Sequence, residues 1–181
     1  MSAVTPEAVA GTYNIDPAHS NVGFGVRHMG IATVRGKFKT FAGTVEATGG
    51  SLKLTGTVEV SSIDTGDEQR DGHLQAPDFF DAAQFPQITF TSTGATDAGD
   101  SKLKLSGDIT IKGITKPIVL VGSISENGQD PWGNDRVGFE VEGEIDRREF
   151  GLVWNQTLPN GSFLIAHEVK LVVSVSAVRA A

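Results

Sequence analysis

Phe163-Leu-Ile-Ala-His-Glu-Val-Lys-Leu-Val-Val-Ser-Val-Ser-Ala177 is the stretch that decides the fold. Its odd-numbered residues are apolar apart from His167, whereas its even-numbered residues include Glu168 and Lys170. Successive side chains of a β-strand point to opposite faces, so this alternation predicts a long strand with one face in the protein interior.

The same alternation recurs along the chain and predicts eight main strands. They lie at residues 20–28, 32–48, 52–63, 87–93, 102–112, 116–126, 136–146 and 163–177, with a shorter strand near 12–15. The apolar positions change phase near Thr40, which indicates a bulge or bend. Glycine-containing turns between the segments, such as Gly49-Gly50, predict an antiparallel meander.

One apolar face per strand fits either a filled sandwich or a closed barrel with an interior. Several segments exceed the usual length of about five or six residues, which favours tilted strands in a barrel of about eight. Gly107, Gly122, Gly143 and Ser92 fall on inward positions, which leaves room for an elongated apolar cavity. Alternatively, these glycines relieve strand twist.

The segment Ile63–Asp81 is predicted to contain the one short helix of the chain. Thr65 and Glu68 have the spacing of a capping box, and Pro77 ends the helix by about Ala76. The helix is too polar to be stable alone, so it is expected to cover something. Two neighbouring rings, Phe79 and Phe80, follow it, and rings in a polar loop usually fill an apolar opening. We therefore interpret the helix as a lid with its carboxylates turned to water.

Titratable groups on this helix do not favour a metal site or a catalytic group. Asp67 and Asp71 share one face, whereas Glu68 and His73 point elsewhere, so three ligands do not converge. Helix-dipole stabilisation explains acidic residues in the first turn. No Ser/His/Asp or phosphate-binding motif appears in a suitable context.

Composition narrows the function classes further. A net charge of −7 argues against binding nucleic acid, which needs clustered Lys and Arg. There is no cysteine, and no apolar run is long enough to span a membrane. Residues 1–11 lack the features of a signal peptide, so a cytoplasmic location is expected. We expect a disordered segment at residues 1–10 and a single domain at residues 11–181.

Several sequence blocks resemble one known family. They are 15–28 (IDPAHSNVGFGVRH), 34–38 (VRGKF), 70–74 (RDGHL), 78–81 (DFFD), 85–86 (FP), 105–117 (LSGDITIKGITKP) and 148–152 (REFGL). In order and spacing they are similar to the YceI-like polyisoprenoid-binding family, over nearly the whole chain.

The resemblance implies an all-β, lipocalin-like, extended eight-stranded antiparallel barrel with one short helix capping one end. It also implies a lumen that holds a long isoprenoid chain, such as a polyprenyl phosphate or the tail of an isoprenoid quinone. We expect no metal and no cofactor other than such a bound lipid. A homodimer is expected by analogy with the family.

We select candidate ligand-binding residues by two criteria: they lie at strand positions that are predicted to face inward, or they belong to the predicted lid. They are Val22, Phe24, Val26, His28, Val58, Val60, Leu74, Phe79, Phe80, Phe90, Ile109, Leu120, Phe139, Val141, Ile165 and His167. His28 and His167 could bond a polar head group, or each could be a core histidine paired with a backbone carbonyl.

The leading hypothesis is a non-enzymatic carrier or storage protein for an isoprenoid lipid. The alternative is a small-molecule hydrolase or isomerase that uses His28 or the Glu68, Asp71 and His73 group as acid or base, which requires two convergent titratable groups. A third reading is an interaction domain with a filled core, which a cavity too small for an alkyl chain would favour.

Overall fold

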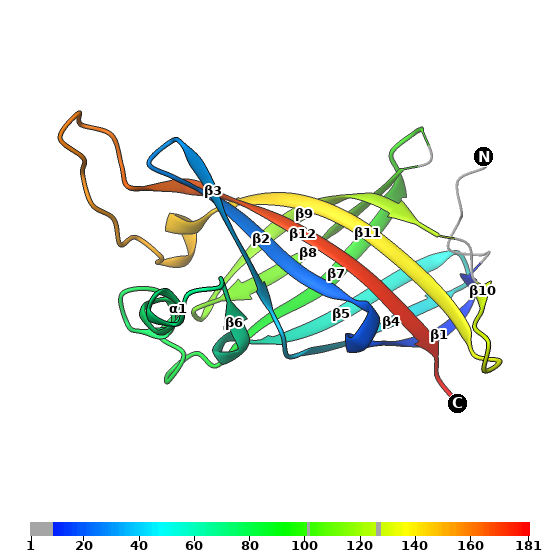
Figure 1. Ribbon diagram of the computed structural model, residues 1–181. Coiled ribbons are helices and arrows are strands. Elements are labelled where there is room, and N and C mark those ends of the chain that lie inside the picture. The colour runs from blue at the N-terminus through cyan, green and yellow to red at the C-terminus, as the bar shows by residue number, and fades with distance from the viewer. Residues whose placement is uncertain (1–8, 101, 126–127) are drawn as a thin grey trace.

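Antiparallel strands make up most of the computed structural model, which describes residues 9–100, 102–125 and 128–181 (Figure 1). The strands are β1 (Gly11–Ile15), β2 (Asn21–His28), β3 (Ala32–Phe38), β4 (Phe41–Thr48), β5 (Ser51–Glu59), β6 (Ile63–Asp64), β7 (Gln87–Asp97), β8 (Leu103–Ile111), β9 (Ile114–Ile124), β10 (Gly128–Gln129), β11 (Asp135–Asp146) and β12 (Ile165–Arg179). In the described residues one α-helix occurs, α1 (Glu68–Gln75), with 3₁₀ turns η2 (Pro17–His19), η3 (Val60–Ser62) and η4 (Arg147–Phe150).

The sheet closes on itself. Neighbouring strands run in the order β11-β9-β8-β7-β5-β4-β1-β12, and β12 then pairs with β11, which makes a ring of eight. The closing pair is long, from Arg136 opposite Val178 to Asp146 opposite Glu168. Every pairing is antiparallel. The predicted eight-stranded antiparallel barrel with one short helix is therefore confirmed.

The other edge of β12 is shared between β1 and β2. β1 pairs with its C-terminal part and β2 with its N-terminal part, with η2 between them. The predicted strand at 32–48 is divided in the same way, because β3 pairs with β2 and β4 pairs with β1. Lys39 and Thr40 separate these two strands, so the phase change marks the point where the chain changes partners.

The two ends of the barrel differ (Figure 1). At the end that carries β10, which we call the plugged end, Tyr13, Val45, Val137 and their neighbours form a buried cluster. The Arg179 guanidinium lies 5.0 Å from the Tyr13 ring centre and covers it. The opposite end, which we call the α1 end, carries α1, the β2–β3 turn, η4 and the chain that follows it.

Val9 belongs to the cluster at the plugged end and is fully buried. The expected disorder of residues 1–10 is therefore wrong for this residue, because its side chain packs among the apolar ends of the strands. Residues 1–8 lie outside the described residues.

The inward glycines do not provide the interior space in the way expected from the sequence. The ring of Phe90 lies over Gly107, and Leu120 lies over Gly143. At Gly122 the backbone of Glu140 approaches too closely to admit a side chain. The Ser92 hydroxyl accepts a hydrogen bond from Leu54 N–H (2.8 Å). These positions are thus occupied by neighbouring atoms, and the cavity lies elsewhere between the strands.

Gly107→Ala is expected to lower the free energy of unfolding by about 1–3 kcal/mol, the usual cost of overpacking. An added Cβ would lie 2.5 Å from the Phe90 ring and 2.7 Å from Thr91 O. Gly94→Ala on β7 is the control, because its Cβ would meet nothing within 4 Å. Urea denaturation measures the free energy of unfolding of both variants. An equal loss of stability in the two would contradict the account of Phe90 packing on Gly107.

Candidate functional site: an apolar cavity inside the barrel

A cavity of about 280 Å³ runs inside the barrel. Phe139 and Val175, which belong to the cluster at the plugged end, line it at its inner limit. Leu74 and Ile165 line it at the α1 end. Its size is close to the lower limit for small-molecule sites, roughly 300 Å³. The barrel is therefore filled at one end and hollow towards the other.

Most residues nominated from the sequence lie on the wall of this cavity. They are Val22, Phe24, Val26, His28, Val58, Leu74, Phe79, Phe80, Phe90, Ile109, Leu120, Phe139, Val141 and Ile165. The cavity explains why Val22, Phe24 and Val26 point inward and yet are only half-buried. Their role in binding a ligand stays a prediction.

Val60 and His167 are not among the residues that line the cavity. Val60 lies in η3, where the chain leaves the sheet and its N–H bonds Pro86 O (2.9 Å). His167 lies in a bulge: Ile165 faces His28 and Val169 faces Val26, so four steps along β12 match two along β2. The bulge breaks the phase, and the His167 ring packs on Phe163 instead, 4.8 Å between centres.

The two rings after α1 contact different walls. Phe80 meets Phe38 of β3 edge-on at 6.2 Å, and Phe38 in turn meets Phe24 at 5.7 Å. Phe79 is buried and packs on Trp154 (5.5 Å) and on His73 (5.0 Å). The segment after α1 therefore bridges from β3 to the chain that follows η4, and both rings line the cavity.

The N-cap of α1 lies two residues after Thr65, the N-cap that the capping-box pattern predicts. Asp67 is the N-cap, and its carboxylate accepts a hydrogen bond from Arg70 N–H (3.0 Å). Thr65 instead donates its N–H and its hydroxyl to the Asp71 carboxylate (2.9 and 2.6 Å). The prediction that the helix carboxylates face water is therefore wrong for Asp71, because this carboxylate ties the helix to the strand before it.

The acidic and histidine residues of α1 do not converge. Asp71 bonds Thr65, whereas His73 Nε2 lies 3.1 Å from the Asp78 carboxylate and its ring lies edge-on to Trp154. Within the described residues, no group of three His, Asp or Glu side chains could hold a metal ion.

Arg147 is a wall residue that sequence reasoning missed. It is 4% exposed and donates hydrogen bonds to the carbonyls of Leu152 (2.6 Å), Trp154 (3.0 Å), Ala166 (2.8 Å) and Ile165 (3.4 Å). Burial lowers its pKa, because the charged form loses hydration. Arg147 thus fixes the chain from Leu152 to Ala166 at the α1 end. Arg147 directly precedes the block at residues 148–152 (REFGL), and this position next to a recognised block was the one sign in the sequence that could have drawn attention to it.

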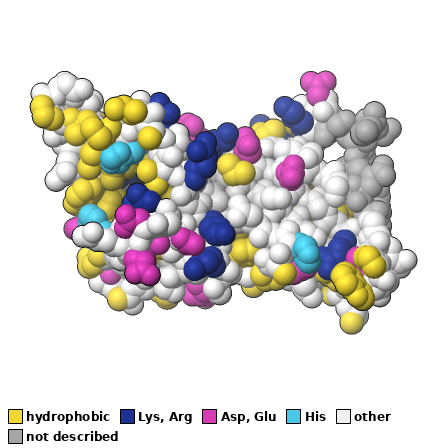
Figure 2. All heavy atoms as spheres, viewed as in Figure 1, with side chains coloured by type: hydrophobic (Ala, Val, Ile, Leu, Met, Phe, Trp, Pro, Cys, Tyr) yellow, Lys and Arg dark blue, Asp and Glu magenta, His cyan; other side chains and the backbone are white. Residues whose placement is uncertain are grey.

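Exposed apolar side chains gather around the α1 end (Figure 2). Met29 and Ile31 sit on the β2–β3 turn, and Val153 and Phe163 lie in the segment between η4 and β12. The Met29 N–H donates to Leu164 O (2.7 Å), so the turn and this segment are joined. No helix in the described part of the chain is long and apolar enough to cross a bilayer.

Comparison with known proteins agrees with this architecture. The sequence model of the YceI-like domain matches residues 13–177. The chain belongs to the YceI-like family. It is 39% identical over 180 residues to Protein YceI of Salmonella arizonae and of Salmonella enteritidis, covering 97% of this chain and 91% of each relative.

Solved structures of the family superpose on this YceI-like barrel. Burkholderia cenocepacia BcnA gives a TM-score of 0.77 at 25% identity, covering 90% of this chain and 98% of BcnA. The Campylobacter jejuni YCEI protein gives 0.73 at 30% identity, covering 86% and 90%. A polyisoprenoid binding domain from Saccharophagus degradans gives 0.68 at 15% identity, covering 93% and 98%, a likeness of fold.

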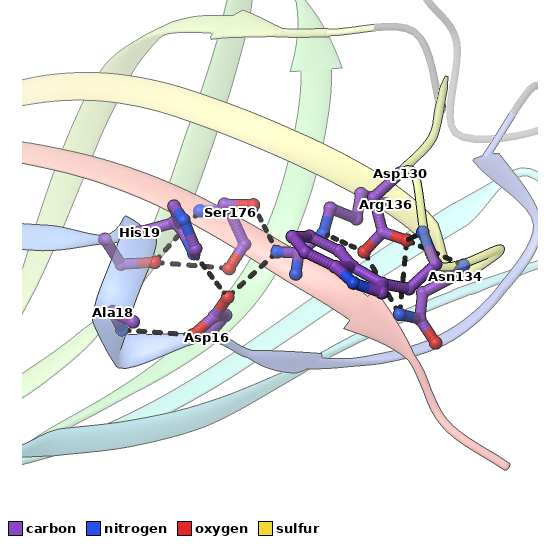
Figure 3. Close-up of polar contacts among 9 residues, drawn as sticks. Asp16, Ala18, His19, Asp130, Asn134, Arg136 and Ser176 are labelled. Carbon is purple, nitrogen blue, oxygen red and sulfur yellow. Dashed lines mark hydrogen bonds and ion pairs between the residues drawn. The ribbon is translucent and has the colours of Figure 1, made fainter.

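The YceI-like chain also carries a polar network on the surface near the plugged end (Figure 3). Arg136 of β11 donates to Asp130 (2.8 Å) and to Asp16 (2.9 Å), the N-cap of η2. His19 Nδ1 lies 2.8 Å from the same Asp16 carboxylate. Because both carboxylates are engaged by one guanidinium, we interpret the network as a structural tie between β11 and the β1–β2 connection.

Hydrogen bonding within this network makes stability depend on pH. The Arg136 and His19 hydrogen bonds lower the pKa of Asp16 from 3.8 to about 2. A lowered folded-state pKa means that the unfolded chain binds protons first as the pH falls. The stabilisation is therefore complete above about pH 3.8 and is lost as the pH falls through about 2.

Asp16→Asn is expected to be less stable than the wild type at pH 7, with the difference shrinking as the pH is lowered towards 2. Denaturant unfolding at a series of pH values measures it. Asp108→Asn, on an exposed β8 residue, is the matched control and should show little difference from the wild type at neutral pH. If the difference in free energy of unfolding between Asp16→Asn and the wild type stays constant with pH, the ion-pair account is contradicted.

Proposed function

We propose that this YceI-like chain is a non-enzymatic carrier or storage protein for a long isoprenoid lipid, a polyprenyl phosphate or an isoprenoid quinone. The observation that carries the proposal is the cavity between the strands, whose wall is made mainly of aliphatic and aromatic side chains. Burying an alkyl chain there would contribute roughly 25 cal/mol per Å² of apolar surface. The predicted cytoplasmic location and homodimer stay predictions.

Family likeness supports the same class of ligand. The Saccharophagus degradans neighbour is described as a polyisoprenoid binding domain. The barrel interior supports it independently, because a filled core would leave no space between Phe90, Ile109 and Val141. A barrel that is filled at the plugged end and hollow towards the α1 end suits a ligand that enters lengthwise.

The enzymatic alternative finds less support in the site. His28 lies on the cavity wall, but no side-chain hydrogen bond joins it to another titratable group among the described residues. The Asp71 and His73 side chains have separate partners, Thr65 and Asp78. General acid–base catalysis needs a second convergent group, which this arrangement does not supply.

Organic extraction of the purified protein followed by mass spectrometry is expected to yield an isoprenoid lipid. Delipidated protein should also take up a fluorescent prenyl probe, because the probe transfers apolar surface from water into the cavity. Extraction without lipid combined with no uptake of the probe would refute the proposed function.

Phe80→Ala is expected to speed ligand release several-fold, because it removes the ring contact between the α1 segment and Phe38. Phe79→Ala should act in the same direction but also lower the free energy of unfolding by about 3–5 kcal/mol, since this ring is buried. Stopped-flow release of the prenyl probe measures both rates.

Gln69→Ala is the matched control on the exposed part of α1. It should leave release and stability close to those of the wild type. If Phe80→Ala releases the probe at the wild-type rate, α1 and the segment after it are not a lid.

A further inference from the structure

Five of the exposed apolar side chains at the α1 end form a group that we call the apolar rim (Figure 2). They are Met29, Ile31, Ile114, Val153 and Phe163, which are 37% to 75% exposed. The three segments that carry them are in contact. Met29 N–H donates to Leu164 O (2.7 Å), and a Cβ on Gly151 would lie 3.8 Å from Ile114 Cδ1. Single exposed apolar residues are ordinary, whereas a contiguous group marks an interaction site.

The segments that carry the apolar rim contain no acidic residue. Residues 27–32, 112–116 and 151–164 include Arg27, Lys112 and Lys116 but no Asp or Glu. The whole chain has the opposite balance, with 22 acidic residues against 15 basic ones. Acidic side chains at this end of the molecule gather over α1 instead (Figure 2). The apolar rim is therefore accompanied by cations alone on a protein that is acidic as a whole.

One part of the rim is a hydrogen-bonded hairpin that extends beyond the ends of the strands (Figure 1). Leu158 N–H donates to Ser162 O (2.7 Å), and Gly161 N–H donates back to Leu158 O (2.9 Å). Leu164 N–H donates to Gln156 O (2.8 Å). Backbone polar groups that leave water for a bilayer must be bonded within the protein. At these positions the hairpin already meets that requirement.

The apolar rim is continuous with the cavity wall. His28 lines the cavity, and the next residue, Met29, is exposed on the rim. Leu152 lines the cavity in the same way, and Val153 after it is exposed. Whatever covers the rim therefore also lies next to the α1 end of the cavity.

We propose that the apolar rim docks this protein on the surface of a phospholipid bilayer. Ile31, Val153 and Phe163 enter the boundary between headgroups and acyl chains, where binding strength grows with the buried apolar area. The exposed Arg27 and Lys116 lie near lipid phosphates and add electrostatic attraction. The docking itself does not depend on what fills the cavity. Exchange of a lipid between the bilayer and the cavity does rest on the proposed function.

Charge favours a bilayer over a second copy of the chain as the occupant of this surface. Two rims placed face to face would bring the cations of both copies together, and the same segments hold no acid that could pair with them. Anionic phospholipids supply the complementary charge over a continuous surface. A bilayer also accepts apolar side chains from several segments without requiring a matching shape.

Flotation with phospholipid vesicles tests the docking surface. Wild-type protein is expected to float with vesicles of phosphatidylcholine and phosphatidylglycerol, and to bind pure phosphatidylcholine several-fold more weakly. Ile31→Ser combined with Val153→Ser should bind about tenfold more weakly than the wild type, because less apolar area enters the bilayer. Val119→Ser combined with Val121→Ser is the matched control, because it removes two exposed valines of β9 away from the rim. This control should bind like the wild type.

Equal binding by the two double variants would overturn the assignment of the rim, and so would a wild-type protein that does not float. Size-exclusion chromatography covers the other occupant. Dimers that form in the wild type and not in the rim variant, without flotation, would make the rim an interface between copies. Uptake of the prenyl probe from solution reports on the cavity separately. Uptake without flotation overturns the docking and leaves the proposed function intact, whereas flotation without uptake does the reverse.

Discussion

Pairing of β12 with three partners is the constraint on which the rest of the structure depends. One edge of β12 binds β11 along almost the full length of both strands, which closes the barrel. The other edge binds β1 and then β2, so the chain must break between them at η2 and again between β3 and β4. This arrangement fills the barrel where β1 and β4 complete the ring and leaves it hollow where β2 and β3 diverge from it.

The hollow half acquires its chemical character from a few residues. Apolar side chains on β2, β7 and β9 make a surface that any alkyl chain would contact favourably. Arg147 differs from them, because its hydrogen bonds organise the chain between η4 and β12 while its charge remains without a carboxylate partner in the described residues. One buried side chain thus holds in place the chain that surrounds the α1 end of the cavity.

The alternation of apolar and polar residues predicted the barrel, because one face of each strand contacts the protein interior and the other contacts water. Every second residue is therefore apolar. The same reasoning placed Phe24 and Val141 on the cavity wall. It failed at His167, where a bulge breaks the phase, and at Val60, where the chain has already left the sheet. It also failed at Gly107, since the ring that fills the space belongs to a neighbouring strand. Arg147 escaped notice because its role depends on carbonyls that only the folded chain brings together.

The divergence of β3 from the ring leaves an edge strand in a fold that otherwise has few. Beyond β2, β3 pairs only with β6 among the described residues, at Lys37 opposite Asp64 and Phe38 opposite Ile63. Unpaired strand edges are templates for pairing with other chains, and charged side chains are a common protection. Arg35 is exposed on the part of β3 that β6 leaves unpaired, and the exposed Lys37 follows two residues later, so two molecules that approached edge to edge here would bring like charges together. The charged side chains of β3 therefore protect an edge that the closure of the barrel leaves open.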